Sequence, residues 1–147
     1  MTHADDLRAW AKGVYAIEAG TELLLRAFNG RFAAPGNPWI GASKTPEGPH
    51  QIRAWIDFDS IPEHVGALSG GERRFLLLAA SLGGGEPVIL SDVLPGLDRD
   101  NLELVLAAVS HAGGSHEHSG MTFDEAGTPK AFTHLTTLYP WPKGNEA

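Results

Sequence analysis

The sequence predicts an α+β fold in which helix outweighs strand, built as a single domain over residues 1–147. Two observations carry this prediction. Apolar residues recur every three or four positions in several segments, which is the spacing of a helix with one buried face. Around residues 51–58 they instead alternate with polar residues, which is the spacing of a half-buried strand. We therefore expect a long N-terminal helix, two further helices and a small sheet.

The long N-terminal helix is expected over residues 5–28. Its apolar positions follow the three-and-four spacing at Leu7, Trp10, Val14, Ile17, Leu24 and Phe28. Asp5 or Asp6 would cap its first turn, and Gly30 would end it. A narrow apolar seam of this kind suits packing against another helix. It is therefore also a candidate surface for forming an oligomer.

A proline- and glycine-rich connection is expected next, over residues 29–50, with Trp39 and Ile40 as a short apolar anchor. In the strand that follows, one face carries Ile52, Ala54, Ile56 and Phe58. Trp55 falls on the opposite, polar face of that strand. An exposed indole there would indicate a contact surface, unless a helix or loop covers this face as well.

The two further helices are expected after Ser69, as far as Leu82, and after Asp98, as far as the pair Gly113-Gly114. Ser and Asp favour the N-cap position, and glycine favours the position just past a helix. Between the two helices, residues 87–90 are apolar and predict a short buried strand. The chain from residue 115 to 147 is expected to be a polar, partly irregular tail with a weak strand at 132–139.

The charge and composition exclude several classes of protein. The chain has 18 Asp and Glu against 11 Lys and Arg, a net charge of -7, which disfavours binding to nucleic acid. No apolar stretch approaches the roughly 20 residues of a membrane span, and the acidic start is unlike a signal peptide. Without cysteine there are no disulfides or thiolate metal sites. We expect a cytoplasmic protein with no membrane or nucleic-acid partner.

Residues 68–98 contain three short motifs in a fixed order. They are Leu68-Ser69-Gly70-Gly71-Glu72, then Val88-Ile89-Leu90-Ser91-Asp92, and then Gly96-Leu97-Asp98. Their order, and the separation of 24 positions from Leu68 to Asp92, resemble the signature sequence, Walker B strand and D-loop of ABC-type ATPases. The resemblance implies an ATPase-like half-site that completes a pocket for Mg-ATP bound on another chain. Its nucleotide-binding residues would be Ser69, Gly70, Gly71, Glu72, Asp92 and Asp98, with Asp92 holding Mg²⁺ through water.

The same segment departs from that family and also has a purely structural interpretation. The chain contains no G-x-x-x-x-G-K-[ST] phosphate loop, and Val93 stands where the family has its catalytic glutamate. Ser69 and Glu72 have the spacing of a capping box at a helix start, and Asp98 is a good N-cap. The sequence leaves both interpretations open.

A second candidate site is the histidine-rich stretch that contains His111, His116 and His118. Imidazole is a common ligand of zinc, and His116 and His118 would share one face if they lay on a strand. These three histidines are therefore a candidate zinc site. The alternative is a polar loop in which His111 offsets the negative end of its helix.

A partner surface is the third kind of candidate site. Arg73 and Arg74 lie in the first turn of a helix, where the helix dipole disfavours cations, so an outside carboxylate or phosphate is a plausible partner. Trp55 would belong to the same class of site. No set of residues forms a recognisable catalytic group. The expected function is thus a non-catalytic, partner-binding protein without a cofactor, acting on a protein partner or as a homo-oligomer; the half-site and the zinc site are alternatives.

Overall fold

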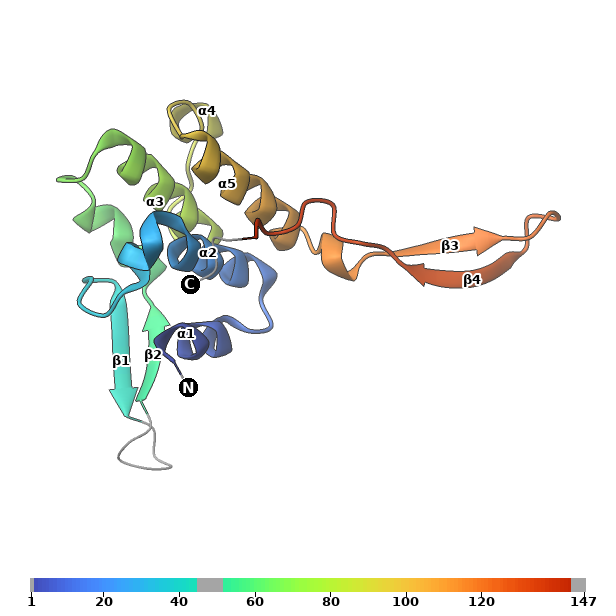
Figure 1. Ribbon diagram of the computed structural model, residues 1–147, viewed down its shortest axis with the longest axis horizontal. Coiled ribbons are helices and arrows are strands. Elements are labelled where there is room, and N and C mark those ends of the chain that lie inside the picture. The colour runs from blue at the N-terminus through green and yellow to red at the C-terminus, as the bar shows by residue number, and fades with distance from the viewer. Residues whose placement is uncertain (1, 45–51, 144–147) are drawn as a thin grey trace.

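The computed structural model describes residues 2–44 and 52–143 and has the α+β architecture expected from the sequence (Figure 1). The α-helices and strands, in chain order, are α1 (His3–Ala11), α2 (Tyr15–Arg26), β1 (Ile40–Lys44), β2 (Ile52–Ile56), α3 (Gly70–Leu82), α4 (Leu90–Val93), α5 (Arg99–Ala112), β3 (Ser119–Phe123) and β4 (Pro129–His134). Three 3-10 segments join them: η1 (Ala27–Ala33), η2 (Phe58–His64) and η3 (Ser115–Glu117). No helix in these ranges is both long and apolar enough to cross a membrane.

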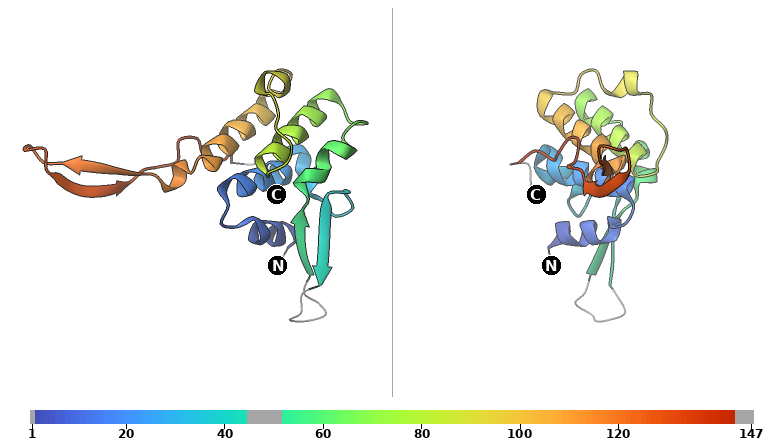
Figure 2. Two further views of the ribbon diagram at one scale, coloured as in Figure 1. Left: turned by 180° about the vertical axis from the view of Figure 1, so that it is seen from behind. Right: turned by 90° about the vertical axis from the view of Figure 1, so that its right-hand side faces the viewer.

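Helix α2 lies at the centre of the helical body, where α1, α3 and α5 pack around it (Figure 2). Leu23 and Leu24 of α2 are buried together with Phe75 of α3 and Leu104 of α5. These residues belong to one hydrophobic cluster. The core of the body is therefore continuous from the N-terminal helices to α5.

The helix expected over residues 5–28 is two helices, which corrects the sequence prediction. The chain breaks between α1 and α2 at Gly13, whose φ of +106° is a conformation that glycine adopts without a steric cost. The expected apolar seam is divided by this break. Leu7 and Leu24 are buried in the core, whereas Val14 next to the break is 52% exposed, so the seam is not one continuous surface.

The small sheet expected around residues 51–58 is confirmed as an antiparallel hairpin of β1 and β2, although residues 45–51 lie outside the described part of the chain. Ala54 and Ile56 are buried as predicted, and α1 packs against β2. Trp39 is a buried anchor whose indole Nε1 donates a 2.8 Å hydrogen bond to the carbonyl of Phe32.

The starts of α3 and α5 confirm the predicted caps. Ser69 and Glu72 form a capping box, and the carboxylate of Asp98 accepts a 2.8 Å hydrogen bond from the amide of Asn101. Helix α5 ends at Gly113, and Gly114 follows with a φ of +77°. Short polar side chains and glycines thus fix both helix boundaries.

The buried strand expected at residues 87–90 is wrong. Residues 87–89 form no strand, and Leu90 begins the one-turn helix α4. Ile89 and Leu90 are 66% and 59% exposed, whereas a core strand would bury both. Among the described residues, the strands pair only as β1 with β2 and β3 with β4, so residues 87–90 join neither sheet.

The C-terminal region differs most from the sequence prediction. In the tail that was expected to be partly irregular with one weak strand, β3 and β4 form a second antiparallel hairpin, and only its second strand overlaps the strand expected at 132–139. The hairpin projects away from the helical body beyond the end of α5 (Figure 1). We call residues 119–134 the arm. Every residue of β4 is exposed, as are four of the five residues of β3.

Candidate functional sites

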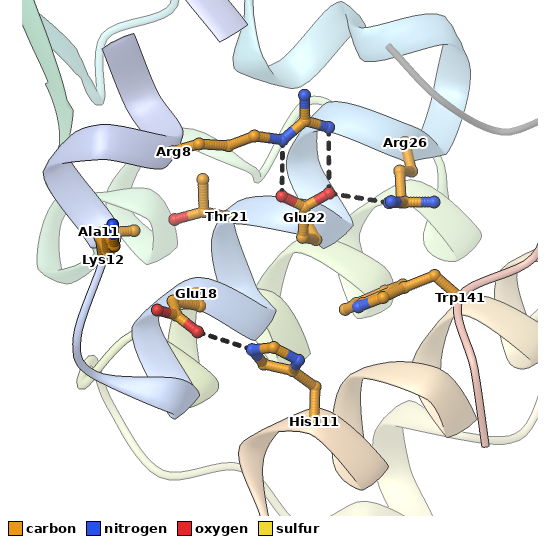
Figure 3. A pocket seen from close by; sticks show the side chains of 9 residues that line it. All are labelled: Arg8, Ala11, Lys12, Glu18, Thr21, Glu22, Arg26, His111 and Trp141. Carbon is orange, nitrogen blue, oxygen red and sulfur yellow. Dashed lines mark hydrogen bonds and ion pairs between the residues drawn. The ribbon is translucent and has the colours of Figure 1, made fainter. Parts of the chain in front are cut away.

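A polar pocket of about 340 Å³ lies between α1, α2 and α5 (Figure 3). Its lining residues are contributed by three helices and by the chain after the arm: Arg8, Ala11, Lys12, Glu18, Thr21, Glu22, Arg26, His111 and Trp141. The guanidinium of Arg26 lies 4.9 Å from the centre of the Trp141 ring, within cation–π range. Trp141 therefore closes one side of the pocket.

One wall of this pocket is an ion-pair network centred on Glu22. Its carboxylate accepts hydrogen bonds of 2.8 Å and 3.0 Å from Arg8 and of 2.8 Å from Arg26. Burial raises the pKa of the Glu22 carboxyl, but the hydrogen bonds from the two arginines lower it by more, so the pKa lies below its ordinary value. The network joins α1 to α2 across the break at Gly13.

The opposite wall holds Glu18 and His111, whose Oε1 and Nε2 atoms are 2.7 Å apart. The other oxygen of Glu18 accepts a 2.8 Å hydrogen bond from the amide of Gly13. Burial raises the pKa of Glu18, whereas the Gly13 and His111 hydrogen bonds lower it, and the net effect is a lowered pKa. The His116 ring stacks on the His111 ring, with centroids 4.2 Å apart and planes within 5° of parallel.

Of the three histidines proposed from the sequence as a zinc site, the structure brings two together and places the third apart, and zinc binding itself stays a prediction. His111 and His116 do meet, and Glu18 is the third group near them, with potential ligand atoms all within 4.8 Å of one another. His118 is exposed and belongs to the segment that enters the arm. We call Glu18, His111 and His116 the histidine cluster. Sequence spacing could not find Glu18, because 93 residues separate it from His111.

Three of the residues that resemble the ATPase motifs, Ser69, Glu72 and Asp98, are engaged in helix capping. Ser69 Oγ and the Glu72 carboxylate satisfy each other's backbone amides, and Glu72 also pairs with Arg31 at 2.9 Å. Asp98 caps α5, while Asp92 is exposed. The Walker-B-like residues do not form a strand, as stated above.

Gly70 and Gly71 approach the loop that contains Gly96. A Cβ atom on Gly96 would lie 2.5 Å from the Arg74 guanidinium, and one on Gly70 would lie 3.1 Å from it. The Nε atom of Arg74 is buried and has no hydrogen-bond partner among the described residues. Arg73 is exposed. Neither arginine forms an ion pair within residues 2–44 and 52–143.

Trp55, for which the sequence left open an exposed or a covered indole, is half-buried. Gly41 is its cross-strand partner on β1, and a Cβ atom on Gly41 would lie 2.2 Å from the indole ring. The ring therefore covers the space that a side chain at position 41 would fill. Trp55 has a structural role in this hairpin, and its part in binding a partner stays a prediction.

An apolar groove of about 260 Å³ lies between α3, α4 and α5. We call it the α5 groove, and its lining is almost entirely aliphatic: Leu78, Ser81, Leu82, Val88, Leu90, Leu94, Leu102, Val105, Leu106 and Val109. Leu106 and Val109 on α5 are exposed, at 45% and 58%. Sequence analysis missed this groove because it assigned residues 87–90 to a buried strand. The unusually apolar exposed side of α5 is the signal that could have indicated it.

The arm also carries large apolar side chains on its surface. Phe123 and Phe132 are 58% and 78% exposed, and Leu138, just after the arm, is 81% exposed.

No protein-family model matches the chain, and no match was found among curated proteins or among solved structures.

Proposed function

We propose that this chain is a non-catalytic protein whose partner is a second copy of itself, held by the arm of each copy in the α5 groove of the other. The observation that carries this proposal is the exposure of the arm. A two-stranded hairpin by itself is only marginally stable in water, and here both strands carry large apolar side chains with no cover from the described chain. Contact with a partner would bury them.

The α5 groove has the chemistry that such an arm requires. Its lining is aliphatic, and the arm offers Phe123 and Phe132, so contact between them removes apolar surface of both from water. The groove and the arm are also neighbours along the chain, because the arm follows the C-terminal end of α5. A two-fold axis that passes between two antiparallel arms would therefore lay each arm along the other copy's groove.

The size of the two surfaces supports a stable contact. A standard interface takes roughly 20–30 residues from each partner. The arm spans residues 119–134, and ten residues line the groove, so the two surfaces together reach that range. With the arms exchanged in both directions about that two-fold axis, the contact is self-complementary and closes as a dimer, whereas a one-way contact would extend into a fibre.

The test uses two charge variants of the full chain, Phe132→Lys in the arm and Leu106→Glu in the groove. Sedimentation velocity up to about 100 µM, well above a micromolar Kd, should give a wild-type dimer and monomers for each variant alone. Mixing the two variants should restore a dimer, because one unaltered arm meets one unaltered groove. Val14→Lys, at an exposed apolar residue remote from both surfaces in the sequence, is the matched control and should dimerise normally.

Two results would overturn the proposal. One is a wild-type chain that stays monomeric over this concentration range. The other is a dimer that survives in both charge variants, since the interface would then lie elsewhere. Circular dichroism of each variant establishes that the helical body is folded, so that loss of the dimer is not a loss of the fold.

Nucleotide binding by residues 68–98 is a second candidate function, supported by one observation. The Arg74 guanidinium lies against Gly70 and Gly96, and its Nε atom has no hydrogen-bond partner among the described residues, so this cation is a candidate partner for a phosphate group. Addition of Mg-ATP should then raise the melting temperature of the protein, and Arg74→Gln should abolish that rise. An unchanged melting temperature in millimolar Mg-ATP would exclude binding by the isolated chain.

A further inference from the structure

We propose that the histidine cluster, Glu18, His111 and His116, binds one divalent transition-metal ion of the zinc class. Each of the three residues offers a ligand atom, and these atoms all lie within 4.8 Å of one another. Imidazole nitrogen and carboxylate oxygen are ligands that zinc commonly takes, and three protein ligands leave a fourth position for water or a small molecule. This inference does not depend on the dimer.

The Glu18–His111 contact is the half of the site that is already formed. The two atoms are 2.7 Å apart, so an ion would replace the shared proton at this contact with a modest opening of the pair. The Gly13 amide donates to the second oxygen of Glu18 and so fixes the orientation of the carboxylate. Such an outer hydrogen bond to a ligating carboxylate is a regular feature of metal sites.

His116 supplies the other half, and it must rotate to do so. Because the His111 and His116 rings are parallel at 4.2 Å, their in-plane lone pairs run side by side and do not converge on one point. The Nδ1 atom of His116 is buried with no hydrogen-bond partner in the described chain, so rotation breaks no such bond there. Gly113 and Gly114 precede η3 and give its backbone the freedom to follow.

The surroundings leave Glu18 available to a cation. Arg8 and Arg26, the two arginines that line the same pocket, both direct hydrogen bonds to Glu22. The remaining cation of the pocket lining, Lys12, is exposed. Thr21 is fully buried, lines the pocket, and has a hydroxyl without a hydrogen-bond partner among the described residues.

The site also lies at the base of the arm, since His116 belongs to η3 and His111 to the last turn of α5. The Tyr15 ring packs edge-on against both histidine rings, with centroids 5.9 Å and 4.7 Å away. An ion held by Glu18 as well as by the histidines would therefore tie α2 directly to the segment that leads into the arm.

The experiment is calorimetric titration of tag-free, chelator-treated protein with zinc chloride, with native mass spectrometry for the stoichiometry. The wild-type chain should bind one ion. His116→Asn should weaken binding at least about tenfold, as loss of a metal-site contact does, and it leaves the Glu18–His111 contact in place. His118→Asn is the matched control, because His118 lies two residues away and is exposed; its zinc affinity should equal that of the wild type.

Binding of Co²⁺ provides a second measurement, because a Glu18–His111 ion pair that binds no metal would give no signal in it. Co²⁺ bound by the wild-type chain should give the visible absorption of a four-coordinate ion, and Glu18→Gln should remove it. The proposal is overturned if the wild type binds no ion at one equivalent, or if His116→Asn and His118→Asn have the same zinc affinity. Titration of the Phe132→Lys variant keeps this outcome separate from that of the dimer.

Discussion

The two hairpins of this protein have the same architecture but very different surroundings. Both consist of two antiparallel strands. Helix α1 packs against the β1–β2 hairpin, and Ala54 and Ile56 are almost completely buried. The β3–β4 hairpin, the arm, has no cover from the body, and Phe132 is 78% exposed. Strand pairing is thus equivalent in the two, and what separates them is the availability of a second apolar surface.

The two hairpins therefore have different roles: one contributes to the stability of the fold, and the other leaves apolar side chains exposed for binding. The β1–β2 hairpin is part of the folded core and stabilises it by burying apolar area. The arm makes little contact with that core, so its apolar side chains are available for another molecule. Substitutions at matched positions in the two hairpins can therefore separate folding from association.

The largest expected difference is between Ile56→Ala in β2 and Phe132→Ala in the arm. Ile56→Ala should lower the free energy of unfolding by about 2–5 kcal/mol, because it leaves a cavity in the core. Phe132→Ala should change it by less than about 0.5 kcal/mol in a monomer, since an exposed side chain loses no packing. Urea unfolding at low protein concentration measures both. Equal losses for the two variants would mean that the arm is packed within its own chain.

A glycine in each hairpin gives the next comparison. Gly41→Ala places a Cβ atom 2.2 Å from the Trp55 ring, and the rigid indole must move. Overpacking of this kind costs about 1–3 kcal/mol. Gly120→Ala in the arm brings a Cβ atom only to 3.3 Å from a methyl group at the flexible end of Leu135. The melting temperature of Gly120→Ala should therefore stay close to that of the wild type, whereas the melting temperature of Gly41→Ala should fall.

The β1–β2 hairpin was also easier to predict from the sequence than the arm. The alternation from Ile52 to Phe58 is a local pattern typical of a strand with one face towards the core, and β2 is such a strand. The arm is exposed on both faces, so no alternation marks it. Its sequence suggested a polar tail with a weak strand, although Asp124 and Gly127 occupy the turn that joins the two strands.

Local caps were predictable for the same reason, and long-range contacts were not. The capping interactions of Ser69 and Asp98 depend on residues three positions away, which the sequence displays directly. The break at Gly13 was missed because the three-and-four spacing of apolar residues continues across it. Glu18 was missed in the histidine cluster because only the packing of α2 against α5 brings it to His111.

A smaller loss of unfolding free energy is expected from a substitution where the arm joins the body. Ser115 is buried, and its hydroxyl lies 2.7 Å and 3.0 Å from the hydroxyls of Ser110 and Thr137 and accepts a 3.2 Å hydrogen bond from the Leu138 amide. Ser115→Ala leaves the Leu138 amide without this acceptor, although the Ser110 and Thr137 hydroxyls keep their mutual contact of 3.2 Å, and it should cost about 1–2 kcal/mol. Hydrogen exchange of the Leu138 amide should accelerate, whereas exchange in β1–β2 should not. Protection that is unchanged at Leu138 would show that other contacts hold the arm.

The smallest effect is confined to acid solution and concerns α1, which covers the β1–β2 hairpin. The two arginine partners of Glu22 hold the pKa of its carboxyl below the value of 4.5 for a free side chain. A lowered pKa in the folded state means that Glu22 stabilises the fold fully above pH 4.5 and loses this contribution as the pH falls through the folded-state pKa. Glu22→Gln cannot titrate, so its unfolding free energy should fall less than that of the wild type over this acid range.

Urea unfolding of both proteins at a series of pH values measures the difference, and parallel pH profiles would contradict the assignment of this acid sensitivity to Glu22. The arm contributes nothing to the Glu22 ion pairs, so Phe132→Ala should follow the wild-type profile.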